Sequence, residues 1–205
     1  PGRSLLIRES AVVQELAALT SGAALTGLRR ALITDSLTVM LEELHAMAGS
    51  RLSCIVNLTA RALPRQASSL HGGHDEYYAV AGTGCFQLFA GNAQEVADFN
   101  VIAHRVAELS LTPGLCAQDL YRTSHGIQNV RLPEPGLITD FLGTPADHID
   151  CPTPAQNVLF GAQRRRIPVL LDRDHPAGLG AVQNRDSYFR ALAAQRPFFY
   201  AHVPA

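Results

Sequence analysis

Little charge and the absence of any long apolar run are the first features of this 205-residue sequence. Charged residues make up 17% of the chain and leave a net charge of −1, so the composition predicts no basic surface for nucleic acid or anionic lipid. No stretch of about 18 consecutive apolar residues is present, so no segment is long enough to cross a bilayer as a helix. Hydrophobic residues reach 47%, which excludes general disorder. We therefore expect a globular protein without nucleic-acid or membrane partners.

Cysteine is scarce and widely spaced. The four cysteines lie about thirty residues apart, and no Cys-x-x-Cys pair occurs. Cysteine-ligated iron–sulfur clusters and zinc ribbons need close cysteine pairs, so we expect neither an iron–sulfur cluster nor a metal on this chain. A secreted disulfide scaffold is shorter and richer in cysteine. The prediction is therefore buried, reduced thiols and a cytoplasmic location.

The sequence also has no initiator methionine. It begins Pro1-Gly2-Arg3, without a basic n-region or an apolar signal run. We interpret the chain as a processed subunit or a piece of a longer polypeptide that is incomplete at its N-terminus. Its length predicts a single domain over residues 1–205.

Strand-like and helix-like apolar patterns alternate through the first part of the chain. Helices are expected where apolar side chains recur every three or four residues, and strands where short apolar runs lie between turn residues. The predicted strands are 4–8, 31–34, 52–58, 84–90 and 115–120, and the predicted helices are 12–24, 37–47 and 94–110. Helices of this length between strands imply crossover connections and a mostly parallel sheet. The predicted fold class is α/β, with three layers in the order α/β/α.

The helix at 94–110 has the clearest signals, and the segment after residue 132 has the weakest. Asn92 and Glu95 are residue types of a capping box. An apolar stripe that should pack on the sheet follows them: Val96, Phe99, Ile102 and Val106. In 132–205, prolines interrupt the periodicity. We predict a loop-rich C-terminal extension there, with short helices at 156–166 and 186–194 and a strand at 198–203.

Arg61 is the most informative single candidate for a functional residue. It directly follows the strand 52–58, at the carboxyl end, where open α/β sheets place their ligands. A guanidinium at that place can form a bidentate pair with a carboxylate ligand. It can also form a structural salt bridge, and the pattern alone leaves both interpretations open.

Two other polar strings have weaker signals. The string His71-Gly-Gly-His74-Asp75 contains metal-ligand residue types, but it is more typical of a hydrogen-bonded loop. The three arginines at 164–166 predict a solvated or interface surface, because nothing else in the chain is strongly basic.

Several ordered motifs between residues 50 and 205 resemble the first domain of the pyruvate:ferredoxin oxidoreductases, a family of thiamine-diphosphate-dependent 2-oxoacid oxidoreductases. The match begins at Thr59-Ala-Arg-Ala-Leu63 and is most specific at 121–128 (YRTSHGIQ), which is similar to the family's F-R-T-S-H-E-I-Q. It continues at 183–189 (QNRDSYF). The resemblance implies a thiamine-diphosphate-binding fold of the pyrimidine type.

The resemblance also implies roles for two residues. The arginine of the family's A-R-A-L string binds the carboxylate of the 2-oxoacid, and Arg61 occupies that position. A glutamate in the family's V-R-E-M-Q-S-E-A-G-A string contacts the aminopyrimidine of thiamine, and Ile7-Arg8-Glu9 looks like the start of that string. Counting on without a gap places Val13 at the glutamate, whereas Glu15 takes the position only if the alignment shifts by two residues. Glu15 is accordingly the candidate contact to the thiamine pyrimidine.

Two family motifs have no match here. They are the Y-P-I-T-P loop, whose threonine faces the substrate, and the motif for magnesium and diphosphate. The first hypothesis is therefore the pyrimidine-side domain of a 2-oxoacid (pyruvate-type):ferredoxin or flavodoxin oxidoreductase. It would share thiamine diphosphate with a partner domain, oxidatively decarboxylate a 2-oxoacid to an acyl-CoA only together with other domains or subunits, and form a homo-oligomer. The alternative hypothesis is a degenerate family domain that serves assembly or interaction in a larger redox protein.

Overall fold

Four parallel strands form the centre of the molecule. The computed structural model describes residues 6–63, 72–169 and 185–203. The strands are β1 (Ala31–Thr34), β2 (Ile55–Ala60), β3 (Phe86–Ala90) and β4 (Gly114–Asp119), and they lie in the order β1-β2-β4-β3 with all neighbours parallel. The predicted parallel sheet is confirmed, and so is the α/β fold class.

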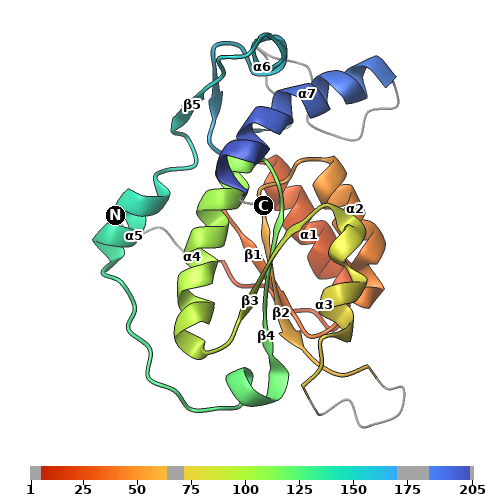
Figure 1. Ribbon diagram of the computed structural model, residues 1–205, viewed down its shortest axis with the longest axis vertical. Coiled ribbons are helices and arrows are strands. Elements are labelled where there is room, and N and C mark those ends of the chain that lie inside the picture. The colour runs from red at the N-terminus through yellow and green to blue at the C-terminus, as the bar shows by residue number, and fades with distance from the viewer. Residues whose placement is uncertain (1–5, 64–71, 170–184, 204–205) are drawn as a thin grey trace.

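Helices cover both faces of this sheet (Figure 1). One face carries α1 (Val13–Leu25), the short helix η1 (Thr38–Met40) with α2 (Leu41–Gly49), and α3 (Asp75–Ala79) followed by η2 (Ala81–Thr83). The opposite face carries α4 (Ala93–Ser110). None of the helices in the described ranges is both long and apolar enough to cross a membrane. The arrangement is the three-layer one that the sequence predicts.

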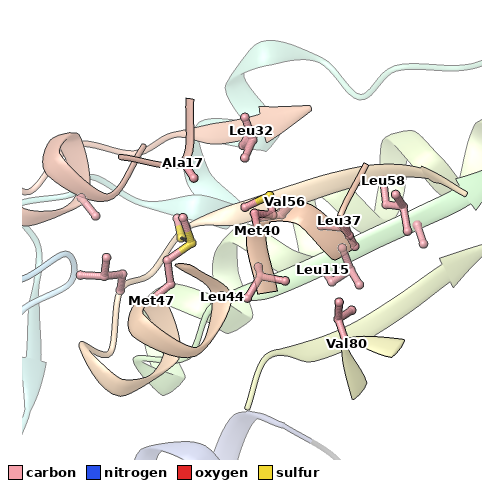
Figure 2. Packing of buried hydrophobic residues seen from close by; sticks show 14 of the residues in the cluster. Ala17, Leu32, Leu37, Met40, Leu44, Met47, Val56, Leu58, Val80 and Leu115 are labelled. Atoms are coloured by element: carbon pink, nitrogen blue, oxygen red, sulfur yellow. Dashed lines mark hydrogen bonds between the residues drawn. The ribbon is translucent and has the colours of Figure 1, made fainter. Parts of the chain in front are cut away.

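The two faces form separate apolar cores because strand side chains alternate. Val56 and Leu58 of β2 point into the larger core with Met40 and Leu44 (Figure 2). Their neighbour Ile55 points the other way, toward α4. Every side chain of the larger core that Figure 2 labels is buried, so this core accounts for much of the hydrophobic stabilisation of the fold.

The order of connections places a topological switch point between β2 and β4. The chain leaves β2 toward α3 on one face. It leaves β4 through the single-turn π-helix η3 (Leu120–Ser124) and then runs across α4 on the other face. Neighbouring strands that feed opposite faces leave a crevice at their carboxyl ends, where open α/β sheets bind ligands. Arg61 and Asp119 stand at this edge.

Helix α4 begins as predicted, and its predicted apolar stripe faces the sheet in part, as Phe99 shows. The Asn92 side chain accepts a hydrogen bond from the Glu95 backbone N–H at 2.9 Å, while the Glu95 carboxylate binds the N–H of Gly91 instead of Asn92. Ala103 and Ala107 are fully buried against the sheet, and Ile102 is 41% exposed. The predicted stripe is therefore wrong at Ile102, because the two small residues at i and i+4 let the backbone approach closely and Ile102 lies about 100° away from Ala103.

After β4 the chain forms an extension with a core of its own. Its elements are α5 (Pro135–Leu142), β5 (His148–Asp150), α6 (Pro154–Phe160), β6 (Gln163–Arg165) and α7 (Arg185–His202), with β5 and β6 antiparallel. The predicted strand at 198–203 is wrong, because its first five residues belong to α7. The helix predicted at 156–166 ends at Phe160 and is followed by β6. Residues 6–8 of the predicted first strand are not in a strand, and residues 4 and 5 lie outside the described part of the chain.

Two arginines join the extension to the α/β body. The Arg29 guanidinium pairs with both oxygens of Glu108, at 2.5 and 2.8 Å, and donates to the carbonyls of Leu142 and Gly143. Arg164 donates to the carbonyls of Glu108 and Leu109, at 3.0 and 2.8 Å, and so caps the C-terminal end of α4. Arg164 is buried, which corrects the prediction of a solvated or interface surface at this one of the three arginines.

Candidate functional site

The candidate site lies at the carboxyl ends of β2 and β4. Arg61 is the residue after β2, and its backbone pairs with Gly72 in an isolated antiparallel bridge. The chain therefore returns to the end of β2 before α3 begins. A side chain at Gly72 would collide with the Asp119 carboxylate at the end of β4, and one at Gly73 would lie 2.6 Å from the Cα of Ala62. Glycine at both positions lets this loop lie directly on the strand ends.

The sequence-predicted metal string is held in this loop by other contacts. The His74 ring packs edge-on against Phe89, with 4.6 Å between the ring centroids. An Asp75 carboxylate oxygen accepts a hydrogen bond from the Leu63 N–H at 3.3 Å. His71 lies outside the described residues. The contacts of His74 and Asp75 fit the hydrogen-bonded loop that the sequence also allows.

Glu76, in the first turn of α3, is completely buried beside Arg61. Its Oε1 accepts hydrogen bonds from the Leu37 N–H at 3.2 Å, the Thr38 N–H at 3.5 Å and the Thr38 hydroxyl at 3.2 Å. These donors stand at the start of η1, so the carboxylate caps that helical segment. The sequence prediction missed Glu76, because its hydrogen-bond donors lie 38 and 39 residues away and no local motif connects them.

Arg61 faces the second oxygen of this carboxylate. The Arg61 Nε lies 4.0 Å from the Glu76 Oε2, and the two side chains are 29% and 0% exposed. Both atoms are buried, and within the described part of the chain neither has a hydrogen-bond partner. The structure thus contains the ion pair, one of the two interpretations that the sequence left open. The distance between Nε and Oε2 is too long for a hydrogen bond, so each atom can still form one. The role of Arg61 toward a substrate carboxylate stays a prediction.

Glu15, the candidate contact to the thiamine pyrimidine, lies away from the core. It is exposed in the first turn of α1 and accepts a hydrogen bond from the Ser10 hydroxyl at 2.7 Å. Val13 is partly buried and packs against the main core. Two residues along a helix are about 200° apart, so the two side chains point in opposite directions. Among the described residues, no hydrogen bond or ion pair connects Glu15 with Arg61.

Glu15 is the acidic residue in the first turn of α1, and it faces solvent. Its contact with the thiamine pyrimidine, which the resemblance implies, stays a prediction.

A pocket of about 320 Å³ lies nearby between the sheet and the first half of α4. Its polar lining includes Asn57 and Thr59 of β2, Gln118 of β4 and Asn100 of α4. Burial raises the pKa of Cys116, which also lines it, to about 12, so this thiol stays protonated at neutral pH. The lining has no charged side chain, and neither Arg61 nor Glu76 contributes to it. The pocket and the Arg61–Glu76 pair are thus separate features of the same half of the sheet.

Comparison with known proteins identifies the family. Residues 11–203 match the family model described as "Pyruvate flavodoxin/ferredoxin oxidoreductase, thiamine diP-bdg". A pyruvate-flavodoxin oxidoreductase of Trichormus variabilis is 33% identical over 189 residues, which is 91% of this chain and 14% of that protein. A pyruvate:ferredoxin oxidoreductase of Moorella thermoacetica is 28% identical over 98% of this chain and 16% of its own length. A pyruvate-flavodoxin oxidoreductase of Klebsiella pneumoniae is 30% identical over 82% of this chain and 13% of its own length.

The chain thus spans less than a fifth of these relatives, whose remaining length has no counterpart here. The match covers both the parallel sheet and the C-terminal extension. It includes β2 with Arg61, α3 with Glu76, and the π-helix η3. The chain belongs to the family of the N-terminal, thiamine-diphosphate-binding domain of the pyruvate:ferredoxin and pyruvate-flavodoxin oxidoreductases.

Proposed function

We propose that this chain is the pyrimidine-side domain of a thiamine-diphosphate-dependent 2-oxoacid oxidoreductase, and that it acts only with other domains or subunits. One observation carries the proposal: Arg61 stands at the switch point of a parallel sheet in a domain of this family. Relatives about six times longer supply the argument for partners. The diphosphate site, the iron–sulfur clusters and the ferredoxin or flavodoxin contact would lie on those partners. A homo-oligomer in the cytoplasm remains the expectation for the assembly.

The part of the chemistry that we assign to this chain is recognition of the substrate carboxylate. A guanidinium binds a carboxylate through two parallel N–H···O bonds in one plane. Arg61 is 29% exposed at the end of β2, so part of its side chain is open to the crevice. The 2-oxoacid would be oriented there with its carbonyl carbon directed toward the cofactor on the partner.

A second function, assembly without catalysis, is favoured by one observation. Counting along the sequence without a gap places Val13 at the family's glutamate, and Glu15, the candidate if the alignment shifts by two, is exposed. A domain without that acid can still hold neighbouring domains in place. The two functions differ in whether Arg61 contributes to turnover.

Substitution of Arg61 in the complete assembly separates the two functions. Arg61→Ala is expected to lower kcat/KM for pyruvate on the order of 10²-fold, the loss expected for a desolvated, charge-assisted pair. Arg61→Lys should recover only part, because an ammonium group lacks the planar two-point contact. The matched control is Arg131→Ala. Arg131 is exposed and binds Gln94 through its backbone, so this substitution should leave kcat/KM unchanged. Unchanged kinetics in Arg61→Ala would contradict the catalytic function and support the assembly role.

A further inference from the structure

We propose that Glu76 is a positioning residue: it holds Arg61 at Nε, so that the terminal nitrogens of the guanidinium are directed to the substrate carboxylate. The inference rests on the proposed function of Arg61 and adds a residue that touches no substrate. It starts from the juxtaposition of a fully buried carboxylate and a partly exposed guanidinium at the end of β2.

The two oxygens of the Glu76 carboxylate have different environments. Oε1 accepts three hydrogen bonds from Leu37 and Thr38. Oε2 is buried, has no hydrogen-bond partner among the described residues, and lies 4.0 Å from Arg61 Nε. A buried anion that is only half satisfied is costly unless a positive charge stands close to it. The Arg61 guanidinium supplies that charge, so the carboxylate attracts Arg61 from a fixed place.

The geometry at Arg61 leaves the other side of the guanidinium for a ligand. Nε is the buried nitrogen that faces Glu76, while 29% of the side chain remains exposed. A guanidinium is planar and has five N–H donors, so a partner at Nε fixes its plane and leaves the terminal Nη1 and Nη2 donors for a second carboxylate. An arginine held in this way loses less conformational freedom when the substrate binds.

The anchoring of Glu76 explains how this position is kept. The carboxylate belongs to α3, and its donors belong to the segment that starts η1. Both elements pack on the same face of the sheet. The carboxylate therefore cannot follow Arg61 if the guanidinium swings out, and the pair restricts Arg61 rather than moving with it.

Kinetics of the complete enzyme test the proposal against a purely structural role. Glu76→Gln keeps the size and the Oε1 acceptor but removes the charge, so KM for pyruvate should rise about tenfold with kcat within about twofold, as expected for loss of uniform binding. The matched control is Glu108→Gln, the same change at another fully buried glutamate. It should lower the melting temperature and leave KM unchanged. An unchanged KM in Glu76→Gln overturns the proposal.

A double-mutant cycle shows whether Glu76 acts through Arg61. In an Arg61→Ala background, Glu76→Gln should have no further effect on KM. An equal rise in KM in both backgrounds overturns the positioning role. If Arg61→Ala raises KM but Glu76→Gln does not, only the role of Glu76 is lost. If Arg61→Ala itself leaves KM unchanged, the proposed function fails and the inference fails with it.

A second measurement does not depend on turnover. In the 205-residue chain, the ¹⁵N-labelled Nε–H of Arg61 can be assigned by its disappearance in Arg61→Lys. Its hydrogen exchange with solvent should be at least tenfold faster in Glu76→Gln and unchanged in Glu108→Gln, because a buried N–H that faces a carboxylate is protected. Equal exchange in the native chain and in Glu76→Gln would show that Glu76 does not hold the guanidinium, and would overturn the proposal.

Discussion

Two arginine–glutamate pairs lie at opposite ends of the strands of the same sheet, which we call the amino edge and the carboxyl edge. At the amino edge, Arg29 reaches both oxygens of Glu108 at 2.5 and 2.8 Å. At the carboxyl edge, Arg61 approaches one oxygen of Glu76 at 4.0 Å. The exposures are nearly the same, 22% and 0% in the first pair and 29% and 0% in the second. Burial alone therefore does not distinguish them.

The two pairs differ in how many of their hydrogen-bond donors and acceptors remain available to a ligand. Arg29 also donates to two carbonyls of the extension, so its Nε and Nη2 donors are used within the protein. In the residues that the structure describes, Arg61 Nε and Glu76 Oε2 both lack a hydrogen-bond partner. A pair with both oxygens engaged joins two parts of a fold, whereas a pair with free donors can still bind something else. The first pair fits a structural role and the second a functional one.

The largest expected effect comes from breaking the amino-edge pair. Arg29→Ala leaves the Glu108 carboxylate buried without its bidentate partner, and the free energy of unfolding should fall by about 3–5 kcal/mol. Urea unfolding of the native chain and the variant measures the loss. Arg165→Ala, an exposed arginine on β6, is the control and should stay within about 0.5 kcal/mol of the native chain. A loss for Arg29→Ala as small as that of the control would contradict the structural role.

The same edge should make stability depend on pH through His104. Burial, together with the nearby Arg29 and Arg30, lowers the pKa of His104 to about 4 from its usual 6.5. The unfolded chain then binds the proton at higher pH than the folded chain, so stability is full above pH 6.5 and falls as the pH drops from 6.5 toward 4. The difference between a pKa of about 4 in the folded chain and 6.5 in the unfolded chain corresponds to about 3–4 kcal/mol at most.

Urea unfolding between pH 7 and pH 4.5 checks this dependence. His104→Asn cannot take up the proton, so its stability should fall less steeply than that of the native chain over this interval. Parallel curves for the two proteins would mean that other groups cause the acid dependence.

The smallest expected effect on stability comes from the carboxyl-edge pair. Arg61→Ala removes a longer interaction, and Oε1 of Glu76 keeps its three donors. The free energy of unfolding should fall by about 1–2 kcal/mol, clearly less than for Arg29→Ala. The comparison predicts opposite rankings of the two variants in stability and in kcat/KM. A single ranking in both measurements would remove the distinction between the pairs.

The local sequence pattern was sufficient to predict the strands of the parallel sheet and the residues at their ends. The strand at 31–34 agrees with β1 at both ends, because a short apolar run between polar residues has few other placements in an α/β domain. Arg61 was placed at the carboxyl edge for the same reason. Glu76 was not found, because its partners come from a segment that meets α3 only after the sheet has formed. Conversely, the aromatic run at 198–203 has strand propensity, but Phe198 is buried in the core of the extension together with Ala191 and Ala194, and this tertiary packing decides for a helix.

The contact of Arg164 with the end of α4 has a consequence for the order of events during synthesis. All four strands and α4 have been synthesised once β4 is complete. The Glu108 carbonyl, however, accepts a hydrogen bond from Arg164, which is translated 56 residues later. In a nascent chain that has emerged from the ribosome only up to β4, the C-terminal end of α4 therefore lacks the hydrogen bonds from Arg164. The extension must be synthesised before the C-terminal carbonyls of α4 can receive these hydrogen bonds. The C-terminal quarter of the domain therefore completes the capping of a helix that begins in its first half.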